Sequence, residues 1–117
     1  MFLWEGVSHY LTTEAVDSVL RIVASCSPGS RLIFTYIHSG ALDGSVEFEG
    51  ARQIVNDVAR LHEPWIFGLR PERVPDFLRE RGLCLETDLS AREYRRKYFG
   101  SAAERMKGSR CRCPRFE

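Results

Sequence analysis

The sequence has no long apolar run. In a chain of 117 residues, no stretch approaches the roughly 20 consecutive apolar residues that a membrane-spanning helix needs. The opening segment MFLWEGV reaches Glu5 after a few apolar residues, and it lacks the basic start and apolar core of a secretory signal peptide. We therefore expect a cytoplasmic protein that does not enter a membrane.

Cysteine and histidine are scarce and are not spaced as metal ligands. The four cysteines could pair in three ways, but without a secretory signal we expect free thiols. His9, His38 and His62 have neither HxxxH nor HxH spacing, so we expect no metal site. The segment Cys111-Arg-Cys113 supplies two of the four ligands that a structural zinc ion needs. Its role stays open.

The near-neutral net charge hides an asymmetry. Residues 1–91 hold 8 Lys/Arg against 13 Asp/Glu, whereas residues 92–117 hold 9 against 3. With Tyr94, Tyr98 and Phe99 among them, these basic residues could bind phosphates. A solvated helix face followed by a flexible end is the more ordinary interpretation. We therefore expect no nucleic-acid partner, and a flexible basic tail over 100–117 that folding does not require.

Apolar periodicity divides the chain into alternating strands and helices. Residues 31–38 (RLIFTYIH) are β-branched and aromatic with almost no polar alternation, which is typical of a strand covered on both faces. Thr12 or Thr13 can cap a helix over 13–26, and Ser90 with Glu93 has the spacing of a capping box. The other expected elements are strands at 2–7 and 83–89, a loop at 39–47, and helices at 48–62, about 71–82 and 90–99. This alternation predicts an α/β fold with a mainly parallel sheet and flanking helices.

Several segments together resemble bacterial members of the leucine carboxyl methyltransferase-like family, which use S-adenosylmethionine. The first is Phe2-Leu-Trp-Glu-Gly-Val-Ser-His-Tyr-Leu-Thr12. The match continues in order over about residues 2–99 through Ala15-Val16-Asp17, Ser30-Arg-Leu-Ile-Phe34, Glu63-Pro-Trp-Ile-Phe-Gly-Leu69 and Phe77-Leu-Arg-Glu-Arg-Gly-Leu83.

The resemblance implies the C-terminal half of a Rossmann-like methyltransferase sheet, with a partial methyltransferase domain over 1–99. Family members are more than twice as long, and their N-terminal half carries a glycine-rich turn that cradles the cofactor. This sequence has no such strand-to-helix turn, so the resemblance implies an incomplete S-adenosylmethionine site and weak or no activity. The family closes its sheet with a final apolar strand, whereas this chain ends in Gly108-Ser-Arg-Cys-Arg-Cys-Pro-Arg-Phe-Glu117.

Two residues near the first expected strand are candidates for ligand contact. Glu5 lies at the carboxyl end of that strand, where open α/β sheets bind ligands, and the resemblance implies contact with S-adenosylmethionine. A solvated acid at a strand end is the alternative. Tyr10 resembles a tyrosine near the family's substrate pocket, where a phenol could orient a carboxylate or hydroxyl group. Simple packing explains Tyr10 equally well.

Trp65 and Phe67 follow the chain break at Pro64. Two large aromatic residues there could line an acyl or aromatic substrate pocket as a lid. They could also form a hydrophobic plug at a helix end, and the sequence does not decide between the two.

Two functions follow from these patterns. The first is membership of the S-adenosylmethionine-dependent O-methyltransferase family, whose methyl acceptor would be a small molecule or a peptide carboxylate that the sequence does not identify. The second is a non-enzymatic interaction module, which pairs through an open sheet edge with a second copy or with a complementing N-terminal half. Catalytic residues are unknown, because no nucleophile–base arrangement is evident and methyl transfer requires none.

Overall fold

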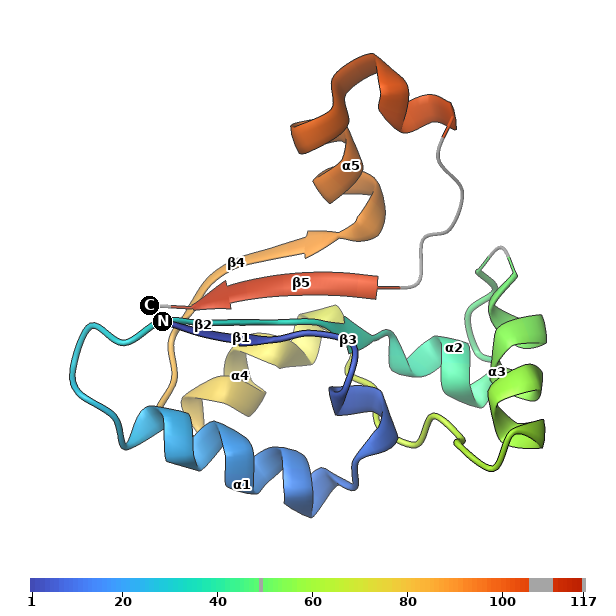
Figure 1. Ribbon diagram of the computed structural model, residues 1–117. Coiled ribbons are helices and arrows are strands. Elements are labelled where there is room, and N and C mark those ends of the chain that lie inside the picture. Colours follow the sequence, from blue (N-terminus) through green and yellow to red (C-terminus); the bar gives the residue numbers. More distant parts are fainter. Residues whose placement is uncertain (49, 106–110, 117) are drawn as a thin grey trace.

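The computed structural model describes residues 1–48, 50–105 and 111–116, the last segment by its backbone. The chain has a mixed α/β fold. Helices α1 (Thr13–Ala24) and α4 (Val74–Arg79) cover one face of a single sheet, and α5 (Ala91–Phe99) lies on the opposite side, beside β4 and β5 (Figure 1). Within these residues, no helix is long and apolar enough to span a bilayer.

The sheet is built from five described strands, β1 (Phe2–Trp4), β2 (Leu32–Phe34), β3 (Tyr36–Ile37), β4 (Leu85–Ser90) and β5 (Cys111–Phe116). β1 pairs with β2 in parallel, while β5 pairs antiparallel with β2, β3 and β4. β2 and β3 meet β5 in one continuous register, so Thr35 interrupts what is otherwise a single strand. Because β2, β3 and β4 all run against β5, they share the direction of β1.

Strand β5 corrects two expectations. The flexible tail predicted over 100–117 contains a 3-10 helix, η3 (Gly100–Arg105), and then β5, which lies between β2 and β4 in the sheet. The predicted parallel pairing holds for β1 and β2, whereas the other strand pairings in the described residues are antiparallel. The prediction of a flexible tail rested on its basic composition. Pro114 is also unusual in an inner strand, because proline cannot donate a hydrogen bond to a neighbouring strand. Residues 106–110 and 117 lie outside the described residues.

Local capping signals place α1 and α5 as expected. The Thr12 side chain accepts a hydrogen bond from the Ala15 backbone N–H at 3.2 Å, which confirms the predicted N-cap of α1. The capping box of α5 is also confirmed, with the Ser90 hydroxyl accepting from the Glu93 N–H while the Glu93 carboxylate accepts from the Ser90 N–H.

A short helix replaces the predicted loop at 39–47. α2 (Ser39–Asp43) begins with the His38 Nδ1 atom accepting a hydrogen bond from the Gly40 N–H at 3.0 Å, and it ends at Gly44 in the left-handed conformation. The prediction of a loop was wrong because histidine is not among the usual N-cap residues. α3 (Ala51–Arg60) follows within the predicted 48–62, and the predicted helix near 71 begins as a 3-10 turn, η2 (Pro71–Arg73), before α4.

The main core lies between the sheet and the helices α1 and α4. Leu32 and Phe34 of β2 point toward Val16 and Leu20 of α1, and all four side chains are fully or almost fully buried. The other buried members of this core are Val23, Tyr36, Phe67, Leu69, Val74 and Leu78. Burial of this apolar surface holds α1 and α4 against one face of the sheet. Leu3 on β1, by contrast, remains 70% exposed.

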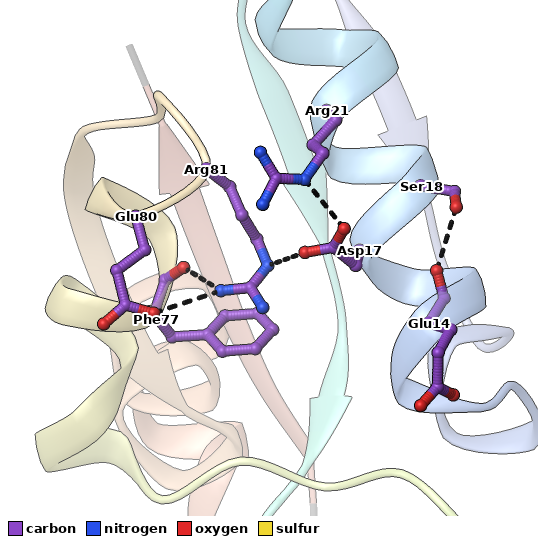
Figure 2. A network of polar contacts seen from close by, with 7 residues as sticks. All are labelled: Glu14, Asp17, Ser18, Arg21, Phe77, Glu80 and Arg81. Atoms are coloured by element: carbon purple, nitrogen blue, oxygen red, sulfur yellow. Dashed lines mark hydrogen bonds and ion pairs between the residues drawn. The ribbon is translucent and has the colours of Figure 1, made fainter.

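An ion-pair network joins α1 to the end of α4 (Figure 2). The Arg81 Nε atom lies 2.7 Å from Asp17 Oδ1, and Arg21 Nε donates to Asp17 Oδ2 at 2.7 Å. The Arg81 Nη1 atom donates to the Phe77 carbonyl at 2.6 Å, and its guanidinium lies 3.7 Å from the centre of the Phe77 ring. Hydrogen bonding from Arg21 and the charges of both arginines hold the pKa of Asp17 below its usual value.

Candidate functional site

The turn after β1 is fixed to the carboxyl end of β2. Gly6 has φ +71°, a left-handed conformation that glycine adopts without steric cost, and its N–H donates to the Thr35 hydroxyl at 2.8 Å. The Thr35 N–H donates to the Trp4 carbonyl at 3.1 Å, and the Ser8 hydroxyl donates to the Thr35 carbonyl at 2.7 Å. These bonds hold the turn Glu5–Gly6 at the common carboxyl end of two parallel strands, with Glu5 exposed.

The next element brings a distant aromatic segment to this turn. The 3-10 helix η1 (Ser8–Tyr10) contains His9, whose carbonyl accepts hydrogen bonds from the N–H groups of Ile66 at 2.7 Å and Phe67 at 3.2 Å. The His9 ring centre lies 4.4 Å from that of Tyr10 and 4.9 Å from that of Trp65. We call His9, Tyr10 and Trp65 the His9 cluster.

Two polar atoms of the His9 cluster are buried without partners. His9 is 7% exposed, and neither its Nδ1 atom nor the Nε1 atom of Trp65 has a hydrogen-bond partner within the described part of the chain. Burial of the imidazole lowers the pKa of His9, because a low-dielectric surrounding disfavours the charged ring. His9 is therefore mainly neutral near pH 7.

The structure separates the sequence-predicted site residues into two groups. Tyr10, 39% exposed, and the half-buried Trp65 lie together around His9, a few residues after Glu5. Phe67 is 4% exposed and packs in the main core, with its ring centre 6.1 Å from that of Phe77. Of the two alternatives for Phe67, its burial in the core therefore favours the hydrophobic plug over the lining of a substrate pocket.

His9 is the residue that sequence reasoning missed. Only its metal-binding spacing was considered, and among the described residues no group of three or more histidine, cysteine or acidic side chains could hold a metal ion. Its position between Glu5 and Tyr10 in the turn after β1 was the available signal. What the sequence did not reveal was the contact with Trp65, more than fifty residues further along the chain.

A separate hollow lies between α2 and α3. This cavity has a volume of about 540 Å³, and Leu42, Phe48 and Val55 supply apolar surface to it. On its rim, hydrogen bonds from Ser45 and the nearby Arg70 guanidinium hold the pKa of Asp43 below its usual value. None of the sequence-predicted site residues lines this cavity.

The sequence matches no protein-family model and no curated protein.

Proposed function

We propose that this chain is part of an S-adenosylmethionine-dependent O-methyltransferase, and that the turn after β1 forms part of its cofactor site. The main support is the position of Glu5–Gly6 at the shared carboxyl end of parallel β1 and β2. Open α/β sheets bind their ligands in the crevice outside the carboxyl ends of the strands. The sequence resemblance over residues 2–99 supports the same assignment.

The residues at this edge fit the chemistry that such a site needs. Glu5 is exposed, so its carboxylate can accept hydrogen bonds from an ammonium or hydroxyl group of the cofactor. Tyr10 and Trp65 supply aromatic surface around His9, four residues after Glu5. The cofactor, when bound, supplies an activated methyl group, and the protein's task is to align donor and acceptor and to exclude water.

The chain holds one part of such a site. The sequence contains no glycine-rich strand-to-helix turn, so the polar groups that would hold the remainder of the cofactor are lacking here. Each hydrogen bond that is not made forgoes about 0.5–1.5 kcal/mol. Weak cofactor binding by the chain alone is therefore part of the proposal.

The proposal is tested in a chimera that restores an N-terminal half from a related methyltransferase. In that protein, Glu5→Gln should weaken cofactor binding by about 1.5–3 kcal/mol, the usual contribution of a hydrogen bond to a charged group. Calorimetry measures the change. Glu72→Gln is the control, because Glu72 is also exposed and lies in η2, outside the proposed site. If both substitutions leave binding unchanged, Glu5 is a solvated acid and the proposal loses its main residue.

A second function, pairing through the open edge of β1, has its own supporting observation. Among the described strands β1 pairs only with β2, and Phe2 and Leu3 are 39% and 70% exposed. The Phe2 N–H and Trp4 carbonyl bond toward the β2 side, so the N–H and carbonyl of Leu3 face the open edge. An apolar edge strand without a charged residue invites pairing with another chain.

Light scattering after size exclusion tests this second function. A dimer that becomes a monomer with Leu3→Lys supports edge pairing, since a charge on an edge strand blocks it. Leu61→Lys is the control, because Leu61 is 71% exposed and lies at the end of α3. A chain that is monomeric at every concentration excludes pairing of β1 with a second copy.

A further inference from the structure

The His9 cluster contains two buried polar atoms, His9 Nδ1 and Trp65 Nε1, that lack hydrogen-bond partners in the described residues. Trp65 Nε1 can only donate a hydrogen bond, and His9 Nδ1 is a nitrogen of a ring that burial keeps neutral. Both atoms are buried, and neither has a partner in the described residues. Folded proteins rarely leave such atoms unpaired, because each loses its hydrogen bonds to water without a replacement.

The two rings lie close together, with centres 4.9 Å apart. When the imidazole carries its proton on Nε2, one hydroxyl group can serve both atoms, because its oxygen accepts from the Trp65 indole N–H and its proton is donated to His9 Nδ1. An ether oxygen can accept but cannot donate. A carboxylate carries a charge that costs much more free energy to bury beside a neutral ring.

Few backbone hydrogen bonds hold the chain at Trp65 itself. The N–H groups of Ile66 and Phe67 are fixed to the His9 carbonyl, and the Glu63 N–H donates to the Val58 carbonyl at the end of α3. Between these anchors, Pro64 has no N–H, and the Trp65 N–H has no partner in the described residues. His62, just before, has φ +61°, a conformation uncommon for a residue with a side chain. The backbone at Pro64 and Trp65 is therefore held by fewer hydrogen bonds than the residues on either side of it.

We infer that His9 Nδ1 and Trp65 Nε1 together form a binding site for the hydroxyl group of a small neutral organic ligand, beside the exposed edge of Tyr10. The site is defined by these two atoms and does not depend on a cofactor. Its interpretation as the methyl-acceptor pocket rests on the proposed function, and it then favours a hydroxyl over a carboxylate acceptor.

The unmodified chain provides a direct readout, because it contains only two tryptophans. The indole N–H signals of Trp4 and Trp65 in a nitrogen–proton correlation spectrum are assigned with Trp4→Phe. Phenol, anisole and benzoate are then titrated in parallel at pH 7.5. Phenol should shift the Trp65 signal saturably and leave that of Trp4 unchanged. Anisole, which lacks the hydroxyl proton, should bind about tenfold more weakly, and so should benzoate.

Each other outcome overturns the inference. If phenol does not move the Trp65 signal, a bound water is the hydroxyl that satisfies the pair. Equal affinity of phenol and anisole means that the ring is bound and the hydroxyl is not recognised. Tighter binding of benzoate means that the site takes an anion.

A variant separates the His9 contribution from the aromatic surface. His9→Phe keeps a ring of similar size but removes the Nδ1 acceptor, so phenol should lose about tenfold in affinity while anisole is unaffected. The chain without any cofactor is used throughout. If Glu5→Gln does not affect cofactor binding, the hydroxyl site at His9 and Trp65 is unaffected. If phenol does not bind at His9 and Trp65, the proposal of a cofactor site at Glu5 is unaffected.

Discussion

At the scale of single residues, the buried His9 imidazole makes the stability of the folded chain depend on pH. Its pKa is lowered by burial, so the folded chain binds a proton less readily than the unfolded chain, in which the pKa is about 6.5. Above that pH neither state carries the proton, and stability does not depend on His9. As the pH falls from about 6.5 through the lower folded-state pKa, the unfolded state gains a proton first, and the folded state loses stability.

We therefore predict that the free energy of unfolding decreases as the pH is lowered from about 7 to about 5. In His9→Phe this loss of stability should be smaller. Urea unfolding at a series of pH values measures it. His62→Asn is the control, because His62 is exposed and asparagine tolerates its positive φ. An unchanged pH profile in His9→Phe would show that His9 is ordinarily solvated.

Arg81 connects α1 to the end of α4. Its side chain is 12% exposed, and its planar guanidinium lets it pair with Asp17, donate to the Phe77 carbonyl and stack on the Phe77 ring at the same time. Arg81→Lys should lower the free energy of unfolding by about 1–3 kcal/mol. Arg79→Lys should change it by less than about 0.5 kcal/mol, because the Arg79–Asp76 pair is exposed. Equal effects of the two substitutions in urea unfolding would contradict this account of Arg81.

At the scale of elements, the sequence predicted what is encoded locally. The caps of α1 and α5 depend on residues three positions apart, and the apolar face of α1 depends on one helical period. α2 was missed because its N-cap is a histidine, and β2 was read as one strand although Thr35 divides it from β3. β5 could not be predicted, since its place in the sheet comes from pairing with strands more than twenty and more than seventy residues earlier.

The position of β5 reverses the expectation that the tail is dispensable. Ending the chain after Arg105 removes the strand that pairs with β2, β3 and β4, and several backbone hydrogen bonds are lost together. We expect the Tm to fall by roughly 10 °C or more. Calorimetry of the shortened chain measures this, with removal of Glu117 alone as the control. An unchanged Tm after the larger deletion would mean that the sheet does not depend on β5.

At the scale of the whole molecule, the sequence predicted where Glu5 and Tyr10 lie relative to the sheet, and their role in binding stays a prediction. Glu5 follows β1 directly and Tyr10 ends η1, so both could be placed near the carboxyl end of the strand from their positions in the chain. Trp65 joins them only through the hydrogen bonds between the His9 carbonyl and residues 66–67. For Phe67 the sequence left a pocket lining and a hydrophobic plug open, and its burial in the main core agrees with the plug.

The central claim is that the edge formed by Glu5–Gly6 and Thr35 holds part of a cofactor such as S-adenosylmethionine. Its most direct test is a titration of the whole chain with S-adenosylhomocysteine, the stable demethylated form of the cofactor, followed by the backbone amide signals. We predict weak, saturable shifts centred on Gly6 and Thr35, which Glu5→Gln reduces. Saturable shifts confined to the cavity between α2 and α3, or no shift at Gly6 at any concentration, would contradict the claim.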